Sequence, residues 1–146
     1  MEERIILEPG RSISGNAGIL LTKVEYIKDN FLIVDAAMND LLRPALYKAK
    51  HDVWSLKEDD SNSKAWIIAG PVCESSDIIA KDIRTNAGEG DTLAIKTAGA
   101  YGFVMSSNYN SRMRSAEVLI DGKEFNIIRT RETFKDLIKN EIGLND

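Results

Sequence analysis

The stretch ILLTKVEYIKDNFLIVDA, residues 19–36, decides the fold of this chain. Two runs that are rich in β-branched and aromatic side chains, residues 19–28 and 31–36, flank the dipeptide Asp29-Asn30. Polar and apolar residues alternate along part of the first run, which is typical of a strand with one buried face. Two turn-forming residues between two such runs predict a β-hairpin.

Three further strands are predicted from similar runs. Residues 51–56 and 65–69 are expected to pair with each other, and the polar residues 57–64 between them are expected to form an exposed loop. Residues 91–96 are predicted to form another strand. The lone histidine, His51, begins one of these strands and is interpreted as structural, because no second histidine or partner cysteine supports a metal site.

The C-terminal part contains the clearest hairpin. Residues 117–120 and 124–129 are joined by Asp121-Gly122, which favours a primed two-residue turn. Residues 132–142 place apolar side chains at helical spacing and predict a terminal amphipathic helix. Several short strands joined by tight turns predict a mainly β fold, a barrel or sandwich, with short helical segments at its ends.

The N-terminal residues form a separate pattern. Residues 4–7 are interpreted as a short strand that stops at Pro9, which has no N–H to donate to a sheet. Ser12 offers an N-cap for a short helix over residues 13–17. A strand, a glycine turn and a helix start in this order can hold an anion, although a plain connection from strand to helix has the same pattern.

Composition narrows the functional class. The chain has 146 residues, one cysteine, one histidine and a formal net charge of -4. One cysteine excludes an internal disulfide framework, and one cysteine with one histidine cannot build a structural zinc site. The negative charge disfavours a general nucleic-acid partner. Because the sequence shows no membrane-length apolar run and no signal-peptide pattern, we expect a cytoplasmic protein that has no membrane partner.

The segment MNDLLRPALY, residues 38–47, is the first to set polar groups among apolar residues. Arg43 and Tyr47 lie four residues apart, so a helical turn would place both on one face, and Pro44 suits the first helical position. An arginine beside a phenol hydroxyl can bind a carboxylate through three hydrogen bonds. An arginine stacked on a surface tyrosine would show the same spacing.

Two more segments also set polar groups among apolar residues. In residues 70–77, Cys73 stands next to a carboxylate at the end of a strand, which suits a proton donor, whereas a lone cysteine is more often buried and inert. In residues 98–110, small residues around Tyr101 would let the backbone approach a ligand closely. A tightly packed crossing in the core would explain the second pattern equally well.

Together and in this order, these segments resemble the pyridoxal-phosphate-dependent diaminopimelate decarboxylases. The resemblance covers almost the whole chain, and it is specific because several ordered motifs carry it. The matching stretches are residues 8–18 (EPGRSISGNAG), 43–47 (RPALY), 70–75 (GPVCES), 99–110 (GAYGFVMSSNYN) and 131–137 (RETFKDL).

The resemblance implies the alanine racemase-like fold type, in which an N-terminal (β/α)₈ barrel is combined with a β-rich C-terminal domain. The chain then corresponds to the C-terminal portion, with residues 1–17 as the remnant of the last barrel strand and turn and residues 18–146 as the β-rich domain. The barrel of the family carries the lysine that binds the cofactor covalently, and no lysine of this chain matches it. We therefore expect the isolated chain to be inactive unless the missing N-terminal barrel is supplied.

The resemblance also implies a site for pyridoxal phosphate. Gly10 and Arg11 resemble part of the cradle for the cofactor phosphate, and Glu8 belongs to the same motif. Tyr101 resembles the tyrosine that lies near the cofactor phosphate and the substrate. The cofactor ring is the electron sink, and the protein supplies orientation and electrostatics. No metal ion is implied.

For the substrate, meso-diaminopimelate, the resemblance implies binding groups from two subunits. Arg11, Arg43 and Tyr47 resemble the groups that hold the distal carboxylate, and two guanidinium forks favour a diacid. Cys73 and Glu74 resemble a pair that reaches across a homodimer interface into the active site of the partner. There Cys73 would protonate the carbon that has lost carbon dioxide, and Glu74 would contact the distal ammonium group.

Two other interpretations fit part of the pattern. An ornithine or arginine decarboxylase domain also resembles the chain around residues 70–73, but typically has Asp at the position of Glu74 and lacks the pattern of residues 43–47; alanine racemase is more distant. A β-barrel module that dimerises or binds a partner without catalysis is the alternative from another functional class.

Overall fold

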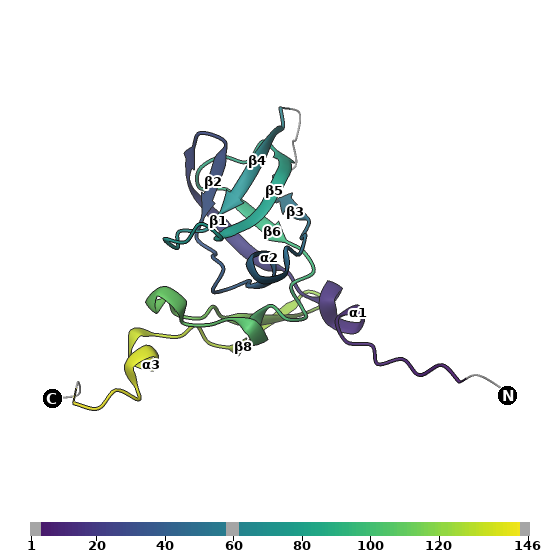
Figure 1. Cartoon of the computed structure of the whole chain (residues 1–146), viewed down its shortest axis with the longest axis vertical. Coiled ribbons are helices and arrows are strands. Elements are labelled where there is room, and N and C mark those ends of the chain that lie inside the picture. The colour runs from purple at the N-terminus through teal and green to yellow at the C-terminus, as the bar shows by residue number, and fades with distance from the viewer. Residues whose placement is uncertain (1–3, 58–61, 144–146) are drawn as a thin grey trace.

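Six strands form one curved sheet in the computed structural model, which describes residues 4–57 and 62–143. In chain order the strands are β1 (Leu20–Lys28), β2 (Phe31–Val34), β3 (Val53–Ser55), β4 (Lys64–Ala69), β5 (Ile78–Thr85) and β6 (Thr92–Ile95). Neighbours in the sheet follow the order β3-β6-β1-β2-β4-β5, and only β2 and β4 pair in parallel. The edge strands β3 and β5 also contact each other, so the predicted mainly β fold is confirmed as a nearly closed barrel-shaped sheet (Figure 1).

The hairpin of β1 and β2 forms as predicted and supplies much of the core. Asp29 has a left-handed backbone with a φ of 53°, which suits the two-residue turn between the strands. Val24 pairs with Val34 across the hairpin, and both side chains are fully buried. Ile68 on β4 and Leu93 on β6 belong to the same core cluster. The core therefore fills the inside of the curved sheet.

The predicted pairing of residues 51–56 with residues 65–69 is wrong. Strands form in both segments, but β3 pairs with β6, and β4 lies between β2 and β5. Sequence analysis missed β5, because polar and apolar residues do not alternate steadily along it and Asp82 within it has a φ of 59°. With β2 and β5 on its two sides, β4 has no free edge left for β3. The strand predicted over residues 91–96 is confirmed as β6.

The lone histidine lies two residues before β3 and does not begin the strand as predicted. His51 is buried, and its Nδ1 lies 2.8 Å from the carbonyl oxygen of Lys96, so a structural role fits. Among the described residues, no cluster of histidine, cysteine or acidic side chains could hold a metal ion. Of the loop predicted over residues 57–64, residues 58–61 lie outside the described part of the chain, and Lys64 belongs to β4.

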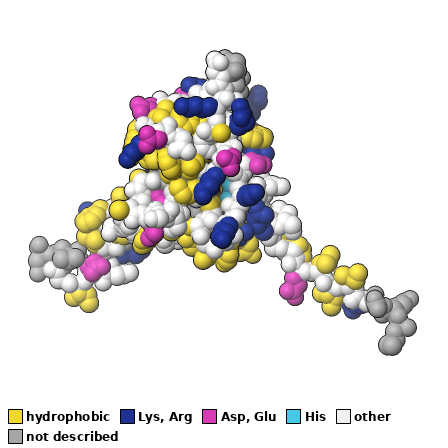
Figure 2. Space-filling model, turned by 45° about the horizontal axis from the view of Figure 1, so that its top comes forward, with side chains coloured by type: hydrophobic (Ala, Val, Ile, Leu, Met, Phe, Trp, Pro, Cys, Tyr) yellow, Lys and Arg dark blue, Asp and Glu magenta, His cyan; other side chains and the backbone are white. Residues whose placement is uncertain are grey.

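The strand predicted over residues 4–7 does not form. The segment is extended, and Ile5, Ile6 and Leu7 are each at least 75% exposed. No other strand of the described ranges pairs with it, and a strand needs such a partner for its backbone groups. Hydrophobic side chains therefore line an uncovered segment, which extends away from the barrel at the lower right of Figure 2.

The helix at the N-terminus begins earlier than predicted. Helix α1 (Arg11–Ser14) has Gly10 at its N-cap position, and a 3₁₀ turn, η1 (Gly15–Ala17), follows directly. Ser12 lies inside α1 and is not the N-cap, so the predicted cap is wrong. No side-chain cap bond is present at Gly10. Because glycine has no side chain, the N-cap residue offers no side-chain acceptor to the first backbone N–H groups of α1.

The C-terminal hairpin lies below the barrel in Figure 1 and is confirmed. It pairs β7 (Glu117–Asp121) with β8 (Glu124–Arg129) in antiparallel register. Gly122 has a φ of 60°, which the primed turn requires. Most apolar side chains of this hairpin are at least half exposed. The hairpin therefore does not share the barrel core.

The terminal helix is shorter than predicted. Helix α3 (Phe134–Ile138) begins with a capping box, in which Thr133 and Asp136 each accept a hydrogen bond from the other's backbone N–H. Ile142 is fully exposed, so the apolar side has nothing to pack against in the next turn, and a short helix without packing is marginal. No helix in residues 4–57 or 62–143 is long and apolar enough to cross a membrane.

Ile68 tests the barrel core. We expect Ile68→Ala to lower the free energy of unfolding by about 2–5 kcal/mol, because the side chain is completely buried. The matched control is Ile120→Ala on β7, where the side chain is 66% exposed and the change should stay within about 0.5 kcal/mol. Urea denaturation followed by tryptophan fluorescence measures both variants. Equal losses would contradict the assignment of the core to the barrel.

Candidate active site

A cavity of about 300 Å³ opens beside the short helix α2 (Arg43–Tyr47). It is lined by Arg43, Tyr47, Tyr101 and Met105. Pro44 occupies the first turn of α2, where a missing N–H leaves no bond unmade. The helical spacing places Arg43 and Tyr47 on one face, so the two side chains that the sequence predicts to be neighbours do face the same cavity.

The guanidinium group of Arg43 contacts two tyrosine rings. Its central carbon lies 5.4 Å from the ring centroid of Tyr47 and 5.5 Å from that of Tyr101. Both distances are within cation–π range, and such contacts hold the planar group without using its N–H donors. The Nε of Arg43 is buried and has no hydrogen-bond partner among the described residues. A buried donor without a partner is costly, so this site favours a ligand that carries acceptors, such as a carboxylate.

Close backbone packing brings Tyr101 to this cavity. The N–H of Ala98 donates to the carbonyl oxygen of Gly18 at 2.9 Å, and the N–H of Gly99 donates to that of Gly15 at 3.0 Å. A Cβ on either Gly18 or Gly99 would collide with the opposing backbone. Tyr101 itself has a φ of 58°, a left-handed conformation that is uncommon for a bulky residue and is often found at functional sites.

Tyr101 also connects the cavity to the start of α1. A Cβ on Gly10 would lie 3.2 Å from the Tyr101 hydroxyl oxygen, so the two residues are in close contact. The side chain of Arg11 packs over Gly15, and its Nε is another buried nitrogen without a partner among the described residues. Gly10, Arg11 and Tyr101, which the resemblance assigns to the cofactor, therefore lie in one region.

These groups fit a cofactor that carries a phosphate. A guanidinium group, a phenol hydroxyl and backbone N–H groups are all donors, and a phosphate offers only acceptors at neutral pH. The unpartnered Nε of Arg11 supplies the observation in favour of such an anion. Glu8, the fourth residue that the resemblance assigns to the cofactor, is exposed, and no described contact joins it to the other three.

Cys73 and Glu74 lie on the loop between β4 and β5, apart from this cavity. Cys73 is an exposed free thiol. Glu74 is also exposed, and its Oε2 accepts a hydrogen bond from the Tyr109 hydroxyl at 3.3 Å. Neither residue lines the cavity of Arg43. The exposure of both side chains is consistent with the expectation that they act on a second subunit.

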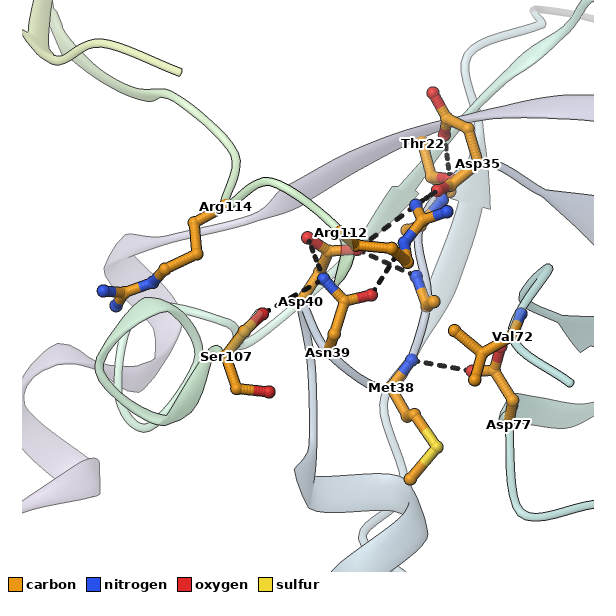
Figure 3. A network of polar contacts seen from close by, with 12 residues as sticks. Thr22, Asp35, Met38, Asn39, Asp40, Val72, Asp77, Ser107, Arg112 and Arg114 are labelled. Atoms are coloured by element: carbon orange, nitrogen blue, oxygen red, sulfur yellow. Dashed lines mark hydrogen bonds and ion pairs between the residues drawn. The ribbon is translucent and has the colours of Figure 1, made fainter. Parts of the chain in front are cut away.

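A polar network anchors the turn that precedes α2 (Figure 3). The Nε of Arg112 donates to the side-chain oxygen of Asn39 at 2.9 Å, and an Nη donates to the carbonyl oxygen of Asp35. Asn39 donates in turn to the carboxylate of Asp40, which also accepts from the N–H of Ala37 at 3.0 Å. Burial raises the pKa of Asp40 above its ordinary value, against the opposing effects of the Ala37 N–H and the Arg112 charge.

Asp77 forms the second part of this network. One carboxylate oxygen accepts from the N–H of Met38 at 2.6 Å and the other accepts from the N–H of Val72 at 2.8 Å (Figure 3). Burial raises the pKa of Asp77, and the two N–H groups and the charge of Arg112 oppose the shift. The carboxylate therefore links the loop of Cys73 to the turn before α2.

The sequence did not single out two residues of the site, Met105 and Tyr109. Met105, at the end of η2 (Phe103–Met105), lines the cavity, and Tyr109, at the start of η3 (Tyr109–Ser111), contacts Glu74. Both belong to the motif GAYGFVMSSNYN, so the sequence did point to the right segment. Only the folded chain shows which side chains of that motif reach which neighbour.

A second cavity, of about 190 Å³, lies between Phe103 and the C-terminal segment. The guanidinium carbons of Arg114 and Arg129 lie 4.2 and 4.5 Å from the centroid of the Phe103 ring. Arg114 also donates to Ser106, and Arg129 to Glu117. Both guanidinium groups therefore already have acceptors within the protein, and the lining of this cavity also includes Arg131, Glu132, Asp136 and Lys139.

The chain is similar to known proteins of one family. The family model described as pyridoxal-dependent decarboxylase, C-terminal sheet domain, matches residues 13–99. The chain belongs to this family. Among curated relatives, a diaminopimelate decarboxylase of Pseudomonas aeruginosa is 53% identical over 141 residues, which are 94% of this chain and 34% of the relative. The chain thus spans about a third of the length of the curated relatives it matches.

Solved structures agree with the sequence comparison. A crystal structure of a protein from Aquifex aeolicus superposes with a TM-score of 0.90 and 44% identity over 99% of this chain and 37% of that one. The crystal structure of diaminopimelate decarboxylase from Helicobacter pylori complexed with L-lysine gives a TM-score of 0.84 and 45% identity over 90% of this chain and 34% of that one. The identification as a C-terminal decarboxylase domain is therefore confirmed by both kinds of comparison.

Asp77 should make the stability of the fold depend on pH. Its pKa in the folded chain is above the ordinary 3.8, so its contribution is fully present below pH 3.8 and is lost as the pH rises through the folded pKa. Asp77→Asn does not titrate. We therefore expect the wild type to gain stability relative to this variant as the pH falls through that window. Urea denaturation at a series of pH values from about 7 to 3 measures the difference, and a change of opposite sign would contradict it.

Proposed function

We propose that this chain is the C-terminal domain of an enzyme that decarboxylates meso-diaminopimelate to L-lysine with pyridoxal phosphate. The observation that carries the proposal is the cavity in which Arg43, with its unpartnered Nε, lies against the rings of Tyr47 and Tyr101. The names of the relatives support the substrate. The barrel domain that the family resemblance implies would supply the remaining part of the active site.

The cavity of Arg43 would select a substrate with a distal carboxylate. Arg43 can donate two parallel hydrogen bonds to a carboxylate, and the Tyr47 hydroxyl can donate a third. Arg11 would add a second guanidinium group to the same end of the substrate or to the cofactor phosphate. Charge-assisted hydrogen bonds of this kind contribute about 1.5–3 kcal/mol each. That energy is available to a diacid and is absent for an amino acid without the second carboxylate.

The cofactor would be held where α1 begins. Gly10 allows close backbone approach, and Arg11 and Tyr101 would donate to the phosphate, with Glu8 in the same cofactor-binding motif. When bound, pyridoxal phosphate is the electron sink that stabilises the charge left at the α-carbon. The residues of this chain would orient the substrate beside it and keep the distal carboxylate away from the reacting bonds.

Cys73 and Glu74 would act on the partner subunit of a homodimer. Cys73 would deliver a proton from its Sγ to the carbon that has lost carbon dioxide, because an S–H group can act as a general acid. Glu74 would hold the distal ammonium group of the substrate through its carboxylate. The exposure of both side chains supports a role at a subunit interface.

The two alternative functions are an ornithine or arginine decarboxylase domain and a dimerisation module without catalysis, and each would need a different site. Ornithine and arginine end in a cation, which the Arg43 guanidinium would repel at the same position. A dimerisation module without catalysis would have no need for unpartnered arginine nitrogens in a cavity. The site therefore favours a decarboxylase of a diacid over both alternatives.

The proposal is tested by joining this chain to the N-terminal two-thirds of the Pseudomonas aeruginosa relative and measuring lysine release. We expect the joined protein to release lysine from diaminopimelate in the presence of pyridoxal phosphate and to leave ornithine and arginine unchanged. The same assay on this chain alone is the control, and we expect no activity there. Lysine release by the chain alone, or none by a folded joined protein that absorbs as a pyridoxal phosphate complex, would overturn the proposal.

Arg43→Lys tests the carboxylate fork in the joined protein. We expect KM for diaminopimelate to rise about 10- to 100-fold, because lysine keeps the charge but loses the bidentate geometry. Arg84→Lys, on the exposed side of β5, is the matched control and should leave KM unchanged. Steady-state kinetics measure both. A KM that does not move in the Arg43 variant would remove Arg43 from the substrate site.

Cys73→Ala tests the proton donor. We expect kcat to fall about 10²- to 10⁴-fold with little change in KM, because a general acid acts on the chemical step rather than on binding. Ser76→Ala, on the same loop, is the control, and its kcat should stay close to that of the wild type. Equal losses in kcat and in affinity for the Cys73 variant would indicate a packing role instead.

A further inference from the structure

The loop between β4 and β5 presents Cys73 and Glu74, and one buried carboxylate holds it. We propose that Asp77 is a positioning residue that fixes this loop to the turn before α2, and so holds Cys73 and Glu74 in the place from which they would reach the partner subunit. The inference rests on the proposed function, because it assigns Asp77 a role in the placement of the proton donor. Asp77 itself touches neither substrate nor cofactor in this proposal.

The contacts of Asp77 are unusual for the end of a surface loop. Its residue is only 2% exposed. Its two carboxylate oxygens accept from the backbone N–H groups of Met38 and Val72, at 2.6 and 2.8 Å, one on each side (Figure 3). Gly70 donates its N–H to the carbonyl oxygen of Asp77, and the Asp77 N–H donates to that of Glu74. Main chain and side chain of this one residue therefore close the loop and attach it to the turn before α2.

Few other hydrogen bonds attach the loop to the rest of the barrel, although the side chain of Val72 is also buried. The N–H of Glu74 donates to the carbonyl oxygen of Val72, a bond within the loop. Among the described residues, the remaining hydrogen bonds out of the loop join Ser76 to the Met38 sulfur at 3.9 Å and Tyr109 to Glu74 at 3.3 Å. Both are longer than the bonds of Asp77, and 3.3 Å between the Tyr109 and Glu74 oxygens is beyond the usual length of an O–H···O bond.

The backbone around Asp77 is built to admit the carboxylate. A Cβ on Gly70 would collide with the Oδ2 of Asp77, and it would lie 2.7 Å from the carbonyl oxygen of Ala36. Any larger residue at position 70 would thus displace the carboxylate from its two donors. The glycine that ends β4 is required by this contact rather than by a left-handed φ.

Met38 connects the loop to the substrate cavity. It belongs to a turn in which the N–H of Leu41 donates to the carbonyl oxygen of Ala37, and the Leu41 side chain is buried in the core. Helix α2 begins at Arg43, directly after this turn. A carboxylate that is bonded to the Met38 N–H therefore sets the distance between the loop of Cys73 and the helix that carries Arg43.

A proton donor that is displaced from its reacting position slows the chemical step. A displacement of about 1 Å in a reacting group can lower a rate about 100-fold. If Asp77 is replaced by Asn, the amide can accept from one backbone N–H but presents its own NH₂ group to the other. One of the two anchors is then lost while the volume of the side chain is kept.

The test is a double-mutant cycle in the joined protein. We expect Asp77→Asn alone to lower kcat about 10- to 100-fold. In a Cys73→Ala background, the same substitution should lower kcat by less than about 3-fold, because the group that Asp77 positions is already gone. A kcat within 2-fold of wild type for the single variant, or a full multiplicative loss in the double variant, would overturn the proposal.

Asp91→Asn is the matched control. Asp91 also accepts from a backbone N–H, that of Gly88, and forms an ion pair with Lys57 at 2.6 Å, but it lies before β6 and away from the loop. We expect its loss to affect the unfolding midpoint and to leave kcat unchanged. A fall in kcat that tracks lost stability equally in both variants would show that Asp77 has only a structural role.

Hydrogen exchange gives a readout that does not depend on activity. In the wild type, the backbone amides of Met38 and Val72 should exchange as slowly as core amides of β4, and in Asp77→Asn at least one should exchange much faster. Rapid exchange of both in the wild type would overturn the anchor, even if the variant does not fold. If the joined protein is inactive, the proposed function fails, while the exchange of these two amides still decides whether Asp77 holds the loop.

Discussion

The turn of residues 35–40, between β2 and α2, is the constraint on which the candidate site depends. Its backbone N–H and carbonyl groups take partners from distant parts of the chain, namely Asp77, Ser107 and Arg112. Helix α2 begins directly after this turn, so the position of Arg43 follows from the same bonds. Buried polar groups that are fully bonded specify one arrangement, because every alternative would leave a donor or an acceptor unmade.

In the cavity of Arg43, by contrast, a charged group lacks a hydrogen-bond partner among the described residues. Arg43 contacts two aromatic rings, and each such contact contributes about 0.5–1 kcal/mol at a partly exposed site. The unpartnered Nε costs about 1–3 kcal/mol, so the two effects are of similar size and the group keeps an unmet need for an acceptor. A guanidinium that is oriented but not neutralised is what a carboxylate-binding site requires. Hydrogen bonds thus fix the turn behind the cavity, whereas the Nε of Arg43 inside the cavity has no acceptor among the described residues.

The fold was predictable from sequence where the contacts are local. Both hairpins were predicted correctly, because the turn residues at 29–30 and 121–122 and the runs on either side lie within one short segment. The pairing of β3 and β4 was predicted wrongly, and β5 was missed. Pairing between distant strands depends on which edges are free in the complete sheet, and no local pattern encodes that. The segment of residues 4–7 has a strand-like sequence but no partner within the described chain.

The sequence by itself determined which residue types are available for the proposed chemistry and in which motifs they occur, since a carboxylate fork or a thiol donor needs particular side chains at particular spacings. It also determined the contact of Arg43 with Tyr47, because helical periodicity alone sets that distance. Only the tertiary structure decided that Tyr101 joins them and lies beside Gly10, because close backbone packing between segments more than 80 residues apart produces this contact. Tertiary structure also decided that the loop of Cys73 is tied to the turn before α2, since a hydrogen bond from Met38 to Asp77 has no signature in either local sequence.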